Sequence, residues 1–242
     1  MQNDYVHLHW DSDCFGFNVA RIIPLDIGDA RLASILQELR ANNYHMVYWD
    51  VPSEYRMVAS MAQKYGGILI DEKVTYVKQI SNAIHATQSQ SCVIAPYLLT
   101  EPEPTLISLA LESGVYSRFK LDPSFPTELW EKLYTCWITR AVRKEIAWEV
   151  LVVRDAGDVL GVVTLGAKGK RGAVGLLGVE PKSRGKGVGT ILISAGERCF
   201  AEHGYADVQI VTQRSNTAAC RLYESCEYQI EAIDNIFHFW LK

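Results

Sequence analysis

The sequence lacks any apolar run that approaches the roughly 20 residues needed to span a bilayer. Its first residues, "MQNDYVHLHWDSD", lack the basic start and apolar core of a secretory signal peptide. Basic residues are not in excess, since the formal charge is −4, which argues against a general nucleic-acid or membrane-surface binder. From these absences we expect a soluble, cytoplasmic protein.

The six cysteines form no CxxC pair and no spacing with histidine that indicates a zinc site. We therefore expect free, buried thiols and no bound metal. His7 and His9 fall on one face of a predicted strand, but two ligands without a third partner make a weak metal site.

Residues 1–80 have the pattern of a small α/β domain. Strands are predicted at 5–10, 14–23 and 45–51, and helices at 29–42 and from a Ser53 cap to the Gly66-Gly67 pair. The stretch 67–80 predicts two short strands around a turn at Asp71-Glu72. Residues 81–104 are predicted to be a linker because polar residues and prolines dominate there, although 91–99 can add an edge strand.

Residues 105–242 are predicted to be a second, larger α/β domain. A helix is expected from Pro126 to about 143, then strands at 147–155, 158–167 and 172–181. Next come a helix from 188 to the stop at Gly204, a strand at 206–213, a helix at 215–225 and a closing strand pair at 228–233 and 236–242. The fold class is α/β with a mixed, mostly antiparallel central sheet.

The loop "PKSRGKGVGT", residues 181–190, joins an apolar strand directly to an apolar-faced helix. Its spacing does not match GxxxxGK[ST], because Lys186 is followed by glycine. It does not match GxGxxG either, because Gly185, Gly187 and Gly189 stand at every second position. Glycines at this position let the backbone approach a ligand, and the helix N-terminus adds free N–H groups and partial positive charge. Phosphate or pyrophosphate is the expected occupant, with a flexible solvent loop as the alternative.

The stretch from Arg184 to Gly189 matches the [QR]xxGx[GA] signature of the GCN5-related N-acetyltransferases, and the resemblance covers roughly 105–242. It implies a GNAT fold that uses acetyl-CoA, preceded here by a smaller, partial GNAT-like domain. The family cradles the pyrophosphate on backbone amides and pairs the pantetheine arm with the preceding strand. The cofactor-binding positions implied are Leu177, Val179, Arg184, Gly185, Lys186, Gly187, Val188, Gly189 and Thr190.

Asn216 and Tyr223 are seven residues apart and so share one face of the predicted helix 215–225. The resemblance implies that Asn216 binds the cofactor and that Tyr223 is the general acid that protonates the CoA thiolate. The alternative for Tyr223 is a half-buried helix tyrosine. Glu227 stands where the family has a glycine that closes the helix in the left-handed conformation, which leaves the turn geometry open.

The central strand "GLLGV" offers no acidic general base, although the family often has one there. In similar enzymes an acidic residue of the N-terminal domain acts through water, which indicates Asp71 here. The alternative is that Asp71 and Glu72 are solvated turn carboxylates. His238 is a second candidate because histidine titrates near neutrality, and a structural strand histidine is its alternative.

Two stretches, "WDSDCFGFNVARI" and "LESGVYSRFKLDP", resemble the TDP-fucosamine acetyltransferase group. This resemblance implies a primary amine of a nucleotide-linked amino-deoxy sugar as acceptor, bound near Tyr116, Ser117 and Arg118. Other amines (an antibiotic, a polyamine, a protein N-terminus or a lysine) and a CoA-binding module without catalysis stay open. No nucleic-acid or membrane partner is expected, and a homodimer is left open.

Overall fold

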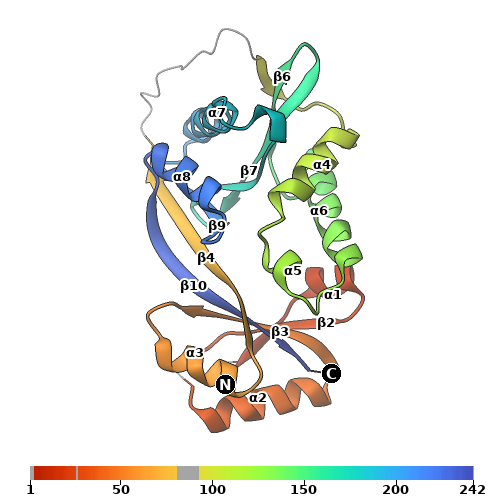
Figure 1. Ribbon diagram of the computed structural model, residues 1–242, viewed down its shortest axis with the longest axis vertical. Helices are drawn as coiled ribbons and strands as arrows, with labels where there is room; N and C mark the ends of the chain where they lie inside the picture. The colour runs from red at the N-terminus through yellow and green to blue at the C-terminus, as the bar shows by residue number, and fades with distance from the viewer. Residues whose placement is uncertain (1–2, 26, 81–92, 242) are drawn as a thin grey trace.

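The computed structural model describes residues 3–25, 27–80 and 93–241. Their strands form one sheet in the order β1-β2-β3-β10-β4-β9-β8-β7-β6-β5. Neighbours pair in parallel at β2–β3 and β8–β9 and antiparallel elsewhere. The α/β fold with a mixed, mostly antiparallel sheet is confirmed (Figure 1).

The strands of the N-terminal part are β1 (Tyr5–His7), β2 (Asn18–Ile22), β3 (Tyr44–Pro52) and β4 (Ile68–Gln79). Those that follow are β5 (Val93–Pro96), β6 (Glu149–Asp155), β7 (Asp158–Lys168), β8 (Arg171–Val179), β9 (Asp207–Gln213) and β10 (Gln229–Trp240). The edge strand expected within 91–99 is present as β5, while residues 81–92 of the predicted linker lie outside the described part of the chain.

The first helices are α1 (His9–Phe15), α2 (Asp29–Ala41) and α3 (Arg56–Lys64). The later ones are α4 (Pro104–Ser113), α5 (Arg118–Leu121), α6 (Thr127–Val142), α7 (Val188–Glu202) and α8 (Thr217–Ser225), with a 3-10 turn at Pro181–Ser183. Helices α2, α6, α7 and α8 were predicted within about two residues of these bounds.

Helices cover both faces of the sheet, as side-chain alternation along the strands requires. On β6, Val150 and Val152 pack in the core that contains α4 and α6, whereas Leu151 and Val153 pack in the core under α7 and α8. On β3 the alternate residues Val47, Trp49 and Val51 pack with α2 in a third core. In Figure 1, α7 and α8 lie on one side of the sheet, α4 and α6 on the other, and α2 and α3 at the N-terminal end.

Three local predictions were wrong. Strands were predicted at 5–10 and 14–23, but residues 9–15 form helix α1, because Ser12 and Phe15 turn to the core together and Gly16 ends the helix at a φ of 76°. Ser53 does not cap the second predicted helix, which is α3. The N-cap residue of α3 is Tyr55, whose side chain makes no capping hydrogen bond.

The third is that both long strands would be interrupted, one by a turn at Asp71-Glu72 and the other between the two closing strands. β4 and β10 are each one continuous strand, because Asp71 lies opposite Ile236 and Glu72 opposite Asn235. The polar residues that suggested turns are held inside the sheet, where Lys73 bonds Asp234 at 2.9 Å. The pairing register of β10 with β4 shifts between Ile236 and Phe237, as at a β-bulge, while both strands continue.

β10, at the end of the chain, lies between β3 and β4 of the N-terminal part. Lys78 of β4 also bonds the buried Glu197 of α7 at 3.0 Å. One sheet and a buried ion pair thus join the segments 1–80 and 105–242, and their division into two domains stays a prediction.

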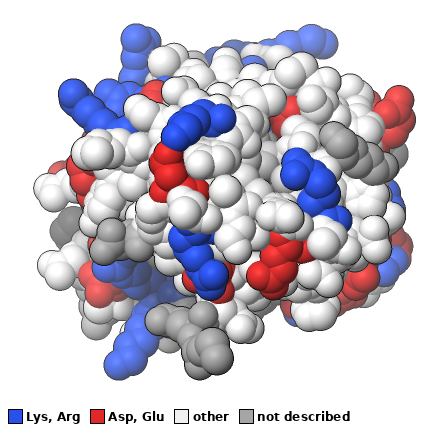
Figure 2. Space-filling model, turned by 90° about the horizontal axis from the view of Figure 1, so that it is seen from below, with Lys and Arg blue, Asp and Glu red and all other residues white. Residues whose placement is uncertain are grey.

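On the face seen from below, acidic and basic side chains are interspersed (Figure 2). Within the described residues, no helix combines the length and the apolar character that crossing a membrane requires.

Candidate functional site

A cavity of about 710 Å³ opens where β8 and β9 separate. The two strands pair over only three positions, from Gly172 opposite Val208 to Val174 opposite Ile210. Beyond that point the β8 backbone from Gly175 to Val179 faces Val211–Gln213 across the cavity instead of a ladder partner. Leu177 and Val179, predicted to bind the pantetheine arm, both line this wall.

The glycine loop closes one end of the cavity. Gly185 and Gly187 have φ values of 72° and 82°, which side-chain-bearing residues adopt at a cost, and Gly187 is the N-cap of α7. Gly189 has a different role, because a Cβ there would lie 2.8 Å from Leu222 of α8. The alternating glycines therefore shape the loop at two positions and permit close helix packing at the third.

The remaining predicted loop residues divide into two groups. Val188 and Thr190 line the cavity together with Arg184, which hydrogen-bonds the Val179 carbonyl oxygen at 3.2 Å and Glu112 at 2.9 Å. Lys186 is exposed and is not part of the cavity lining.

Sequence reasoning missed a bulge in β8 at the inner end of the cavity. The register with β7 shifts between Val163 and Leu165, and the Leu176 N–H donates to Thr164 Oγ1 at 2.8 Å. A Cβ at Gly175 would lie 2.6 Å from that oxygen. A glycine inside a strand is a signal for such a bulge and could have revealed it.

Asn216 and Tyr223 both line the cavity from α8, as their shared helix face predicts. Asn216 caps the helix, its Oδ1 accepting from the Ala219 N–H at 3.2 Å, which leaves the amide nitrogen for a ligand. Tyr223 is only 5% exposed, and its ring meets Tyr76 edge-on at 5.7 Å. Burial raises the pKa of the Tyr223 phenol above its ordinary value, so it keeps its proton at neutral pH.

One of the three predicted acceptor residues lines the cavity. Tyr116 lines it, whereas Ser117 and Arg118 lie behind Tyr134, a lining residue that sequence reasoning missed. Burial raises the pKa of Tyr134, while Ser117 and Arg118 lower it and Asp71 raises it further. Tyr134 is thus the contact between the cavity and the charged groups beyond it.

Arg118 acts electrostatically on four buried or half-buried acidic side chains, and we call this group the Arg118 cluster: Asp11, Tyr48, Asp50, Asp71 and Arg118. The guanidinium stacks on the Tyr48 ring at 4.4 Å. Burial raises the pKa of Asp71 to about 7, although Arg118 and Lys73 act to lower it. Asp71 is 7% exposed, so its alternative as a solvated turn carboxylate is wrong, while Glu72 is exposed.

His238 borders this cluster and is fully buried. Its Nδ1 donates to Asp122 Oδ2 at 2.7 Å, and the same oxygen accepts from Trp240 Nε1 at 2.9 Å. Burial lowers the pKa of His238 to about 4. The ring is therefore neutral at pH 7 and a weak base, which favours the structural interpretation.

Polar atoms without partners concentrate beside the cluster. Of the described residues, Tyr48 OH, Asp50 Oδ1, Arg118 Nε and His238 Nε2 are buried and have no hydrogen-bond partner. Buried polar atoms rarely stay unpaired in native proteins. None of these four residues lines the cavity.

Among the residues that the structure describes, no three His, Cys, Asp or Glu side chains gather in a way that could hold a metal ion. His7 and His9 do lie together, with ring centroids 4.5 Å apart, and His7 Nδ1 is 3.1 Å from Tyr44 OH. Five cysteines are free thiols: Cys14 is buried, and Cys136, Cys199, Cys220 and Cys226 are half-buried. The sixth, Cys92, lies outside the described residues.

Known proteins match both the chain and its fold. Residues 122–228 match the model of the acetyltransferase (GNAT) family. An acetyltransferase from Sodalis glossinidius is 36% identical over 81 residues, 34% of this chain and 57% of that protein. A mycothiol acetyltransferase from Clavibacter sepedonicus is 34% identical over 86 residues, 35% of this chain and 28% of that protein. The chain thus spans less than two thirds of these curated relatives.

The whole chain resembles a solved GCN5-related N-acetyltransferase from Sphaerobacter thermophilus, with a TM-score of 0.66 at 13% identity. The likeness covers 98% of this chain and 76% of that one. The fold is therefore the GNAT fold, and the segment 122–228 is the part of the chain that matches the GNAT acetyltransferase family.

Proposed function

We propose that this protein is an acyl-CoA-dependent N-acetyltransferase that acetylates a small-molecule primary amine. The observation that carries the proposal is the cavity between β8 and β9, on which the glycine loop, an unpaired strand edge and Tyr223 meet. A loop with two left-handed glycines at a helix N-terminus suits a pyrophosphate. The free β8 backbone suits the amides of a pantetheine arm.

The residues divide the chemistry between the two ends of the cavity. The amine nitrogen forms a bond to the acyl carbon as the carbon–sulfur bond breaks. Tyr223 donates its proton to the departing thiolate, which burial of the phenol supports because the group stays protonated at neutral pH. Asp71 accepts the proton lost by the amine through water, because Asp71 itself does not line the cavity.

The pKa values favour Asp71 over His238 as the base. A general base works best when its pKa lies near the operating pH. The pKa of Asp71 is raised to about 7, whereas that of His238 is lowered to about 4. His238 instead orients Asp122 and Trp240.

For the acceptor, we propose a nucleotide-linked amino-deoxy sugar held at the Tyr116 end. The Arg118 guanidinium suits a phosphate, while the surrounding carboxylates suit the amine. Because one relative is named a mycothiol acetyltransferase, the amine substrate of such an enzyme is a second candidate.

The test is thiol release from acetyl-CoA with a panel of amines: TDP-linked amino sugars, the amine substrate of a mycothiol acetyltransferase, polyamines, aminoglycosides and peptides. We expect turnover, fastest with a TDP-linked amino sugar. Faster turnover of another amine would overturn the acceptor and keep the reaction. Tight acetyl-CoA binding without turnover of any amine would favour the CoA-binding module.

Tyr223→Phe tests the general acid directly. We expect kcat to fall by about 100-fold or more, since a positioned proton donor contributes roughly that much, while the Kd of acetyl-CoA stays within about twofold. The matched control is Tyr228→Phe, a buried tyrosine whose ring is 6.4 Å from Tyr223 but which does not line the cavity. An unaltered kcat in Tyr223→Phe would remove its role.

A further inference from the structure

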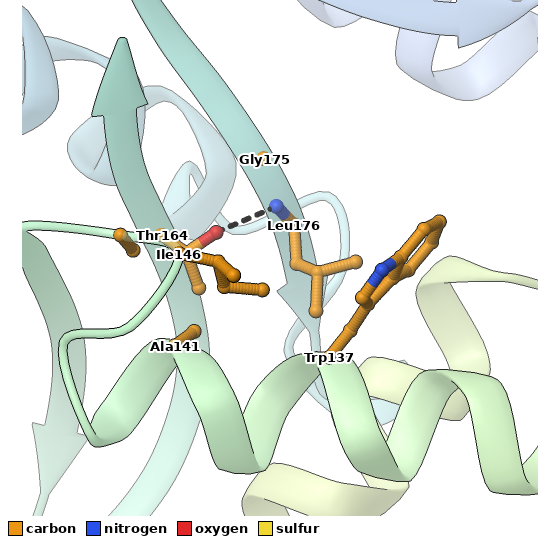
Figure 3. A pocket seen from close by; sticks show the side chains of 7 residues that line it. Trp137, Ala141, Ile146, Thr164, Gly175 and Leu176 are labelled. Atoms are coloured by element: carbon orange, nitrogen blue, oxygen red, sulfur yellow. Dashed lines mark hydrogen bonds between the residues drawn. The ribbon is translucent and has the colours of Figure 1, made fainter. Parts of the chain in front are cut away.

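A second, smaller cavity of about 160 Å³ adjoins the first at the β8 bulge. Trp137, Gly175 and Leu176 line both cavities, so the two share one wall. Figure 3 shows Leu176 and Trp137 projecting into the space between β8 and α6, with Ala141 and Ile146 farther along. The two cavities thus follow one another along β8.

The lining of the small cavity is apolar. Trp137, Ala141, Ile146, Ala147 and Leu176 supply hydrocarbon surface. Its one hydroxyl oxygen, Thr164 Oγ1, already accepts the Leu176 N–H at 2.8 Å (Figure 3). A charged or strongly polar ligand would find no partner comparable with those near Arg118, so the cavity suits a short hydrocarbon chain.

The direction of β8 indicates which chain that is. The glycine loop follows the carboxyl end of β8, and the proposed pantetheine contacts at Val179 and Leu177 lead back toward Leu176. A ligand lying along this path brings its thioester to the bulge. Any chain that continues past the thioester in the same direction enters the small cavity.

We propose that this small cavity is an acyl-chain pocket that lets the protein accept acyl groups longer than acetyl, such as propionyl and butyryl. The inference rests on the proposed function, because it places the thioester at the bulge. The amine acceptor approaches from the Tyr134 and Arg118 end instead, so the two substrates do not compete for space.

The wall of the pocket is held in place by the N-terminal segment. Trp137 stacks on Trp10 of α1 with ring centroids 5.8 Å apart and planes 11° apart, and it meets Tyr134 edge-on at 5.0 Å. Ile146, at 45% exposure, forms the outer side of the pocket. The pocket can therefore be narrowed at Ile146 without disturbing a fully buried residue.

The experiment is calorimetric binding of CoA and of acetyl-, propionyl- and butyryl-CoA to the full chain without an amine. We expect each added methylene to tighten Kd by up to about fourfold, the value for full burial of a methylene group. In Ile146→Phe the preference for butyryl- over acetyl-CoA should disappear. The matched control is Ile23→Phe, the same change at 47% exposure outside the pocket, which should keep the preference.

Ile146→Ala is the second variant, and it should extend the preference to hexanoyl-CoA by opening the outer side. Equal Kd values for all acyl chains, with CoA itself bound, would overturn the pocket and leave the proposed function standing. Failure of CoA itself to bind would overturn both. A change in amine affinity in Ile146→Phe with an unchanged acyl preference would overturn the pocket by assigning it to the acceptor.

Discussion

Asp71 is a buried carboxyl group in β4, and it is the general base that we propose. It lies in β4, is 7% exposed and faces Arg118 rather than solvent. Burial disfavours its ionised form, which raises its pKa to about 7. The sequence indicated the residue, but its pKa depends on burial and then on the charges of Arg118 and Lys73, which only the tertiary structure brings together.

The pH dependence of activity tests this carboxyl group. Since the base must be ionised, kcat/KM should rise with pH through about 7 and level off above it. In Asp71→Asn we expect kcat/KM at pH 8 to fall by about 100-fold and this limb to disappear.

The neighbour provides the matched control: Glu72→Gln changes the exposed carboxylate next in the chain and should preserve both rate and profile. The raised pKa of Asp71 also predicts that its ionisation destabilises the fold. The stabilisation from the protonated carboxyl group is full below about pH 4 and is lost as the pH rises through 7. In Asp71→Asn, the free energy of unfolding should no longer show this pH dependence. If kcat/KM of Asp71→Asn depends on pH as in the wild type, Asp71 is not the base.

Helix α8 shows how one element keeps its geometry without the residue that usually provides it. Glu227 follows the C-cap of α8 and has a φ of 68°, the left-handed conformation that glycine normally supplies. The turn geometry that the sequence left open is thus retained, at the cost of placing a side chain in a disfavoured region.

Glu227→Gly should therefore stabilise the protein. We expect the free energy of unfolding to rise by about 0.5–1 kcal/mol, because relief of the left-handed strain exceeds the extra entropy of glycine in the unfolded chain. Chemical denaturation provides the measurement. Glu227→Ala removes the same carboxylate but keeps a Cβ, so it should give no gain, and equal stabilisation by both variants would contradict the strain.

At the scale of the molecule, the last strand, β10, lies between β3 and β4 of the N-terminal part. β10 pairs with β3 along Asp234–Trp240 and with β4 along Gln229–His238. Removing residues 1–80 would leave β10 without either neighbour and β9 without β4. The buried Glu197 would also lose Lys78.

We accordingly expect a fragment of residues 93–242 to fail to fold cooperatively. Circular dichroism and thermal unfolding of the fragment against the full chain would measure this. A fragment that unfolds cooperatively near the melting temperature of the full chain would contradict the expectation and support the two-domain division at 80 and 105.

The sequence by itself determined the features that depend on local spacing. The α7 helix with its glycine loop and the shared face of Asn216 and Tyr223 follow from residues close in the chain. Such patterns depend on backbone periodicity and on the conformational freedom of glycine, which are local properties.

Only the tertiary structure decided what depends on residues far apart in the chain. Asp71-Glu72 and Asp234-Asn235 have the composition of turns, yet pairing on both sides of β10 holds them in continuous strands. The separation of β8 from β9, the Arg118 cluster behind Tyr134 and the pocket beyond Gly175 each combine segments from different parts of the chain. Long-range hydrogen bonds and burial outweigh local turn preference there, because strand propensity depends on its neighbours.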